Sequence, residues 1–374
     1  MLYDPAAFEP LTDESWDEAR AHDAIAAIVA DADAAFDPDE LWPAHEWDGW
    51  QAALPMKNLY VGAAGVIWAL DDLRRRGFAE TTLDLSAIAL ETLGRWRSEP
   101  DYVAGEELLE PPESALLTGE TGILLVACRL GLPLEEDLRR RIHANLANEA
   151  EDLMWGTPGT LIAAAAMGWD DLAQESADAL ASRRDADGLW TQRGWGSTFR
   201  GIGTVHGLVG NVRALLHVDD PRNEALRAES AAVLAHAATR EDGLANWSSE
   251  GKLQWCAGAP GVVSAARDYL DEELLLAGAG LVWQAGAPGA EKGHGICHGT
   301  SGNGFALLAA FERTQDELWL DRARRFAVHA LAQAANLPGR YSLFTGGAGT
   351  ALFAAACLDA DARYPVLENN RRMH

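Results

Sequence analysis

The sequence predicts an all-α fold, an α/α toroid (barrel) of seven inner and seven outer helices. The first observation is a Gly-x-x-Gly motif that recurs along the chain, and each copy is followed by an apolar run. Such self-similarity with irregular intervals indicates one repeated unit with variable loops. The second observation is that amphipathic and uniformly apolar segments alternate, without convincing strand alternation over six or more residues. The copies begin at Gly62, Gly119, Gly156, Gly207, Gly258, Gly299 and Gly346.

The outer helices are expected where one face carries charged residues, because such a face lies in solvent. The first begins at Asp13-Glu14-Ser15 and continues to about Phe36, since acidic residues in a first turn suit the helix dipole. Residues 1–10 before it are expected to form a loose arm. The other outer helices are expected over residues 84–97, 134–153, 170–184, 221–240, 271–284 and 316–336.

The inner helices are expected directly after the glycines, where the segments are short, rich in alanine and apolar on nearly all sides. An open solenoid needs polar capping repeats at its ends. Here the first and last units are as apolar as the middle ones, which favours closure into a ring. Every Gly-x-x-Gly then lies at one face, together with the long loops before it. The expected ranges are 66–70, 123–130, 160–167, 211–218, 262–270, 305–311 and 350–359.

The repeat predicts a single domain over residues 1–374, in which each unit buries its apolar face on its neighbours. The net charge is −27, which argues against a broad nucleic-acid surface and against attachment to anionic lipid. No apolar run reaches the roughly 18 residues of a membrane span, and residues 1–10 do not resemble a signal peptide. We therefore expect a cytoplasmic protein with reduced thiols and no membrane span.

Reactive residues gather at the two positions before the first glycine of a unit, which are equivalent around the ring. The fifth and sixth units carry Cys256 and Cys297 there, and His298 follows Cys297. Two thiolates and one imidazole make a three-ligand zinc site with one open position, as a catalytic zinc needs. The alternative is that the cysteines are small apolar residues and His298 is a polar loop residue.

Three further residues are candidates for substrate chemistry at the same face. His206 occupies in the fourth unit the position of His298, and beside a zinc ion it suits a general acid/base; alternatively it hydrogen-bonds loop backbone. Lys292 and Arg340 precede the sixth and seventh glycine motifs and are interpreted as contacts for a substrate carboxylate. Residues interpreted as structural are His294, in a mobile glycine-rich loop, and the packing residues Trp155, Trp195 and Trp255.

These motifs together resemble the lanthionine synthetase C-like family, which includes bacterial lanthipeptide cyclases and the eukaryotic lanthionine synthetase C-like proteins. The resemblance extends over about residues 55–360, and as a set the motifs are highly specific. The matching segments are Tyr60-Val-Gly-Ala-Ala-Gly-Val66, Val205-His-Gly-Leu-Val-Gly210, Trp255-Cys-Ala-Gly-Ala-Pro-Gly261, Gly295-Ile-Cys-His-Gly299 with Ser301-Gly302-Asn303, and Tyr341-Ser-Leu-Phe-Thr-Gly-Gly-Ala-Gly349.

The resemblance implies a zinc-bearing toroid with Cys256, Cys297 and His298 as ligands and His206 as acid/base. It implies addition of a thiol to a dehydroalanine or dehydrobutyrine residue, giving a thioether. The partners so implied are a dehydrated peptide or protein, a separate dehydratase, and for some members a small thiol such as glutathione. Lys292 and Arg340 resemble positions that bind glutathione in the eukaryotic members.

The sequence departs from the cyclases at two positions. They carry Asp four residues before the first glycine of the second repeat, where this chain has Ala115, and commonly Tyr after the first zinc cysteine, where it has Ala257. Two hypotheses therefore stay open: a zinc-dependent thiol-addition enzyme, and a non-catalytic zinc-stabilised protein that binds thiols or peptides. A prenyltransferase-like zinc toroid is disfavoured, because the sequence has no basic cluster for a diphosphate.

Overall fold

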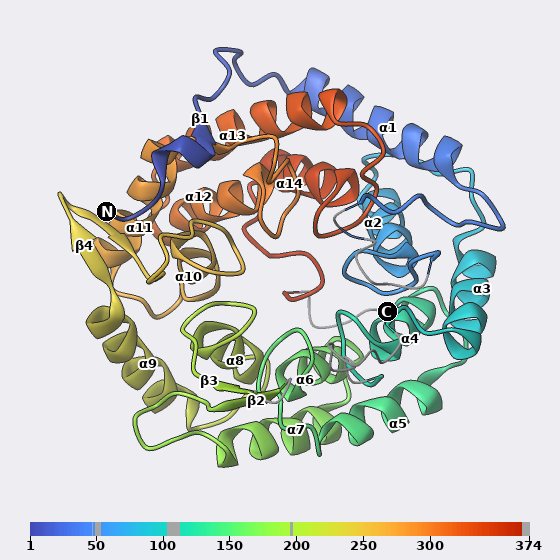
Figure 1. Cartoon of the computed structure of the whole chain (residues 1–374), viewed down its shortest axis with the longest axis horizontal. Helices are drawn as coiled ribbons and strands as arrows, with labels where there is room; N and C mark the ends of the chain where they lie inside the picture. The colour runs from blue at the N-terminus through green and yellow to red at the C-terminus, as the bar shows by residue number, and fades with distance from the viewer. Residues whose placement is uncertain (47, 49–53, 103–112, 195–196, 369–374) are drawn as a thin grey trace.

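The computed structural model describes residues 1–46, 48, 54–102, 113–194 and 197–368, and within them an inner and an outer ring of helices (Figure 1). The inner helices are α2 (Ala63–Arg75), α4 (Glu120–Arg129), α6 (Thr157–Ala166), α8 (Leu208–Leu215), α10 (Ala259–Ala265), α12 (Thr300–Thr314) and α14 (Gly347–Asp359). The outer helices are α1 (Glu18–Ala35), α3 (Leu85–Ser98), α5 (Glu135–Asn145), α7 (Asp170–Ser182), α9 (Asn223–Ala237), α11 (Glu272–Ala285) and α13 (Glu317–Asn336). The predicted toroid of seven inner and seven outer helices is confirmed.

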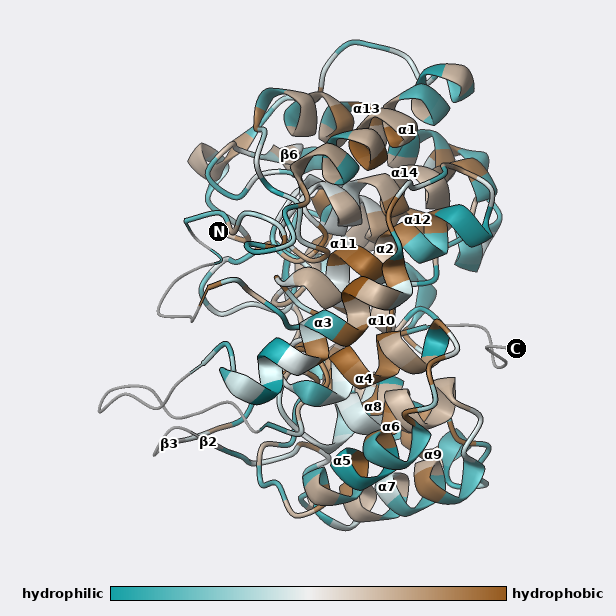
Figure 2. Ribbon diagram, turned by 90° about the vertical axis from the view of Figure 1, so that its right-hand side faces the viewer, coloured by the Kyte–Doolittle hydropathy of each residue, from teal (hydrophilic) through white to brown (hydrophobic). Residues whose placement is uncertain are grey.

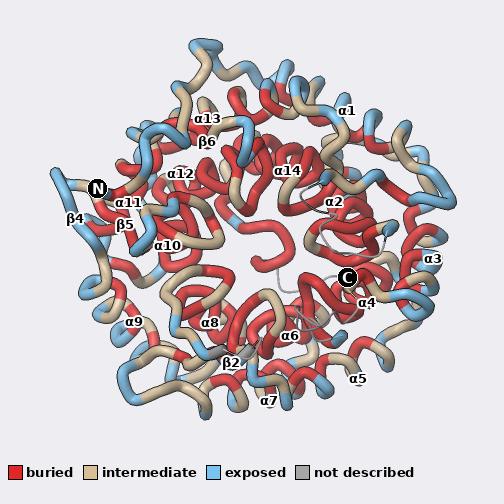
Figure 3. Tube along the Cα trace, in the orientation of Figure 1, coloured by how far each residue is buried: buried red, intermediate tan, exposed pale blue. Residues whose placement is uncertain are grey.

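The ring is closed by contacts between its first and last inner helices. Each inner helix contacts the next one along the chain, and α14 contacts α2. The inner helices are buried on nearly all sides, whereas the outer helices expose one face (Figure 3). This division follows from the sequence, because the inner segments have no charged face and the outer segments do.

Each inner helix begins at its Gly-x-x-Gly because the loop before it passes very close to the helix. The first glycine is the N-cap residue in all seven cases, and the second lies one turn later. A Cβ atom on Gly261 would lie 1.9 Å from the carbonyl oxygen of Trp255, and one on Gly302 would lie 1.9 Å from that of Ile296. The absence of a side chain therefore permits this close approach.

The N-terminal residues differ from the sequence-based expectation in two ways. Helix α1 begins at Glu18 rather than near Asp13, because the side chain of Asp17 accepts a hydrogen bond from the N–H of Arg20 (2.9 Å) and caps the helix there. The expected loose arm is wrong as well. Leu2 is buried, and its carbonyl oxygen accepts a hydrogen bond from Asn246 (2.7 Å), so the arm is attached to the fifth unit.

Strands occur in three short two-stranded ribbons within the described residues. They pair β1 (Phe8–Glu9) with β6 (Ala287–Pro288), β2 (Gln192–Gly194) with β3 (Ser197–Phe199), and β4 (Thr239–Glu241) with β5 (Leu244–Asn246). Each strand has two or three residues, too few for alternation to be visible in the sequence. The β2–β3 ribbon projects from one face of the ring (Figure 2). Among the described residues, no helix combines the length and the apolar character needed to cross a membrane.

Candidate metal centre

The loops that precede the inner helices are joined to one another by backbone hydrogen bonds. In five of these bonds both partners lie two positions before a first glycine. These donor-to-acceptor pairs are Tyr60 to Leu117, Val205 to Cys256, Cys256 to Cys297, Cys297 to Phe344, and Phe344 to Tyr60, and Leu153 donates to Val205. The bonds hold neighbouring loops in a fixed register. The positions predicted to be equivalent are thereby brought to one face of the ring.

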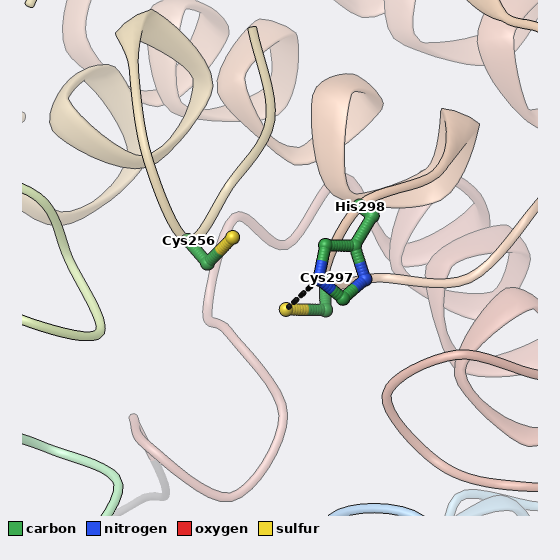
Figure 4. A group of neighbouring side chains, drawn as sticks. All are labelled: Cys256, Cys297 and His298. Carbon is green, nitrogen blue, oxygen red and sulfur yellow. Dashed lines mark hydrogen bonds between the residues drawn. The ribbon is translucent and has the colours of Figure 1, made fainter. Parts of the chain in front are cut away.

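Cys256, Cys297 and His298 converge in this register (Figure 4). Their possible ligand atoms all lie within 4.8 Å of one another, and Cys297 Sγ is 3.7 Å from His298 Nε2. Cys297 is buried, and Cys256 is half-buried. Two thiols and an imidazole are a donor set that zinc prefers, and three protein ligands leave a position for substrate. The residues present therefore fit a zinc ion.

The two thiols have different surroundings. Tyr60 donates its hydroxyl hydrogen to Cys297 Sγ (3.0 Å), and Gln254 donates from Nε2 to Cys256 Sγ (2.7 Å). A hydrogen bond from Cys297 lowers the pKa of Cys256 well below its ordinary value, and burial raises the pKa of Cys297. One thiol of the pair is thus prepared to be a thiolate, the form that binds a metal.

His206 is paired with a carboxylate that the sequence analysis did not identify. Its Nδ1 lies 2.8 Å from Oδ2 of Asp152, a fully buried residue whose other oxygen accepts the N–H of Trp155 (2.8 Å). Asp152 fixes the orientation of the imidazole and leaves Nε2 for proton exchange. The preceding residue, Val205, donates its N–H to the carbonyl oxygen of Cys256 (3.5 Å), so His206 adjoins the first cysteine loop.

Asp152 lies four residues before the first glycine of the third unit. The resemblance placed an aspartate at this register of the second unit, where Ala115 stands; Ala115 is buried in the structure. The third unit thus carries a carboxylate at the register where the second unit has Ala115. The spacing of Asp152 from Gly156 could have indicated this residue in the sequence. Acidic residues are too common in the chain, however, for that spacing to select Asp152.

Aromatic rings enclose His206 on two sides. The Trp155 ring stacks on the imidazole with centroids 4.6 Å apart, and Phe199 of strand β3 meets it edge-on at 6.1 Å. Trp155, predicted as a packing residue, therefore packs on the candidate acid/base itself. Trp255 is buried, as expected of a packing residue, and Trp195 lies outside the described residues.

Lys292 and Arg340 come from adjacent loops beside the metal centre. The Arg340 guanidinium lies so close to Gly293 that a Cβ there would be 2.5 Å from Nη1. Lys292 is exposed, and Arg340 is half-exposed. The two cations are therefore placed in the same region, as a carboxylate contact would require.

A carboxylate lies near Arg340. Asp48 accepts hydrogen bonds from Thr345 (2.7 Å) and Ser342 (3.2 Å), and burial raises the pKa of this carboxyl group.

His294, which was expected to lie in a mobile loop, is buried. Its Nδ1 lies 2.9 Å from Thr350 Oγ1, and burial lowers the pKa of the imidazole to about 4. A structural role for His294 agrees with these contacts.

Comparison with known proteins gives three findings. The family model for lanthionine synthetase C-like protein matches residues 7–368. Glutathione S-transferase LANCL1 of Danio rerio is 37% identical over an alignment of 132 residues, and the match covers 31% of this chain and 31% of that protein. The match thus spans about a third of that relative's length. Among solved structures, nisin cyclase has a TM-score of 0.58 at 16% identity over 80% of this chain and 88% of its own, a likeness of fold.

Proposed function

Because the chain belongs to the lanthionine synthetase C-like family, we propose that it catalyses zinc-dependent addition of a thiol to a dehydroamino acid residue of a peptide or protein. The observation that carries this proposal is the convergence of Cys256, Cys297 and His298 beside the His206–Asp152 pair. It unites, at one face of the ring, a donor set for a thiol-binding metal and a histidine prepared for proton transfer.

Cys256, Cys297 and His298 are the residues that would hold zinc. Zinc held by these residues would favour the thiolate form of a substrate at neutral pH, because a coordinating thiol is deprotonated, whereas a free thiol has a pKa of about 8.5. The protein's share is to keep its own three donors in place. The hydrogen bonds from Tyr60 and Gln254 to the two sulfurs orient these ligands.

His206 handles the proton in the proposed reaction. The substrate S–H bond breaks, the sulfur bonds to Cβ of the dehydroamino acid, and the electron pair of the C=C bond moves toward the carbonyl group. His206 then donates a proton from Nε2 to Cα, and the proton released by the thiol replaces it, so that the reaction consumes no proton overall. Asp152 stabilises the protonated imidazole through Nδ1. Trp155 and Phe199 limit the motion of the ring.

The thiol donor has two possible sources, each with a precedent by name among the similar proteins. A nisin cyclase acts within one peptide, whereas a glutathione S-transferase uses a small thiol. In the second case Lys292 and Arg340 would bind a carboxylate of the thiol, since both cations lie by the same loop. In either case a separate dehydratase would supply the dehydrated residue.

The test is an assay with a dehydroalanine peptide, followed by mass spectrometry. A product heavier by the mass of glutathione identifies transfer, and a cysteine-containing peptide that loses its free thiol without a mass change identifies cyclisation. Arg340→Ala should raise KM for glutathione and leave KM for 2-mercaptoethanol unchanged, because the latter has no carboxylate. Equal changes for both thiols would assign Arg340 to the loop structure instead.

The second candidate function is a non-catalytic, zinc-stabilised protein that binds thiols or peptides. It is favoured by Ala257, which follows the first cysteine and offers no polar side chain to a substrate. A protein that holds zinc and binds the dehydroalanine peptide, yet forms no thioether with any thiol, would support this function over the first.

A further inference from the structure

The chain after α14 runs into the centre of the ring. Residues 360–368 lie in the middle of the ring, close to the loops of Cys256 and Cys297 (Figures 1 and 4). Tyr364, Val366 and Leu367 are buried there, at 3% exposure or less. The segment thus occupies the middle of the toroid next to the two cysteine loops.

Tyr364 contacts both cysteine loops. Its ring stacks on the Trp255 indole, with centroids 4.3 Å apart and planes within 10°, and its hydroxyl donates to the carbonyl oxygen of Ile296. Trp255 and Ile296 directly precede Cys256 and Cys297. One side chain therefore touches the residue before each cysteine, from a segment that belongs to neither loop.

Tyr364 is itself held by a buried ion pair. Glu368 accepts the N–H of Tyr364 (2.8 Å) and pairs with Arg267 (2.9 Å), and both charged side chains are 4% exposed. Arg267 comes shortly after α10, whose first turn follows Cys256, and Glu368 also pairs with Arg213 from α8. Ion pairs therefore anchor the segment to α8 and to the residues after α10, next to the cysteine loops that it contacts.

The backbone of the segment supports a fixed shape. Val366 has a φ of 69°, in the left-handed region that a β-branched residue rarely adopts. Such a conformation persists where the surroundings determine it. The adjacent Leu367 is buried, and its carbonyl oxygen lies 2.8 Å from His217 Nε2, which provides such surroundings.

We propose that Tyr364 is a positioning residue of the metal centre, which sets the spacing of Cys256 and Cys297 from the middle of the ring. The proposal rests on the metal site proposed above but not on the thiol-addition reaction. Because the two cysteines come from different units, their separation depends on what joins the loops. A backbone hydrogen bond from Cys256 to Cys297 joins the two loops directly. Tyr364 joins them a second time, through its contacts with Trp255 and Ile296.

The first experiment measures metal affinity in Tyr364→Phe and Tyr364→Ala. Tyr364→Phe keeps the stacking and loses the hydrogen bond; Tyr364→Ala loses both. Partners outside the ligand set typically contribute 10–100-fold to metal affinity, so we expect zinc binding to weaken by about 10–100-fold in Tyr364→Ala and by several-fold in Tyr364→Phe, against a chromogenic chelator. The thiolate-to-Co(II) absorption of the cobalt form should shift in the same order.

Tyr269→Phe is the matched control. It removes the hydroxyl of another buried tyrosine, and that hydroxyl has no hydrogen-bond partner within the described residues. The control should leave zinc affinity and the cobalt spectrum unchanged. If Tyr364→Ala does not fold, Tyr364→Phe decides: a wild-type affinity and spectrum in that variant would overturn the proposal.

A second measurement needs no metal and no turnover. Cys297 is 1% exposed, so its alkylation by N-ethylmaleimide in metal-free protein reports loop opening. We expect labelling of Cys297, located by peptide mass mapping, to be about tenfold faster in folded Tyr364→Ala than in the wild-type protein. The control Tyr269→Phe should be labelled at the wild-type rate. An unchanged labelling rate together with unchanged metal affinity would overturn the positioning role. A wild-type protein that binds no zinc would instead contradict the proposed function, and the labelling rates would then decide alone.

Discussion

The second and sixth units of the ring have the same backbone and different chemistry. In the second, Leu117 and Thr118 precede the glycine motif; in the sixth, Cys297 and His298 do. Both units take part in the backbone bonds between loops, with Leu117 accepting from Tyr60 (2.9 Å) and Cys297 donating to Phe344 (2.8 Å). The repeat therefore supplies a common frame, and the side chains at two positions per unit decide what that unit does.

The largest difference between these units should appear in metal content. Cys297→Ala should lose most of the bound zinc, because three protein ligands set the affinity. Leu117→Ala at the equivalent position should keep the zinc and lose about 3 kcal/mol of stability through a buried cavity. Elemental analysis and urea unfolding measure the two effects. Full zinc in Cys297→Ala would show that Cys297 is no metal ligand.

The next difference concerns the position just before the first glycine. His206→Asn in the fourth unit should keep zinc and fold and slow thioether formation by roughly 10²–10⁴-fold, the usual range for a general acid or base. Asp152→Asn should slow it too, since the amide cannot stabilise a protonated imidazole. Thr118→Ala in the second unit is the control and should retain wild-type turnover. Loss of zinc in His206→Asn would make His206 a ligand rather than an acid/base.

The features of the fold and of the candidate site that could be predicted from the sequence are those that recur in every unit. The inner helices, their glycine starts and the meeting of Cys256, Cys297 and His298 follow from one motif, because equivalent positions in a ring come to one face. Asp152 and Tyr364 do not repeat. Asp152 is one acidic residue among many until its distance to His206 is known. Tyr364 lies outside every unit, so its contacts with the cysteine loops depend on the path of the chain after α14 into the centre of the ring.

A smaller effect tests the common frame itself. A Cβ atom would lie 2.2 Å from the Leu116 carbonyl oxygen at Gly122 and 1.9 Å from that of Ile296 at Gly302. Alanine at either glycine should therefore destabilise the protein, by about 3 kcal/mol for overpacking. Gly302→Ala should also weaken zinc binding, since it displaces the loop of Cys297, whereas folded Gly122→Ala should bind zinc normally. Equal zinc affinity in both variants would show that the close packing at Gly302 does not affect the metal centre.

The smallest effect concerns pH and distinguishes His294 of the sixth unit from Ser114, which holds the same register in the second. Burial lowers the pKa of His294 to about 4, so between pH 6.5 and 4 the unfolded chain binds a proton that the folded protein does not. Stability from this group is complete above pH 6.5 and falls as the pH drops, by about 2 kcal/mol at pH 5. The loss of unfolding free energy from pH 7 to 5, measured in urea, should be smaller in His294→Gln by that amount. Ser114→Ala should show the wild-type pH dependence, and an equal loss in His294→Gln would mean that His294 is protonated in the folded protein.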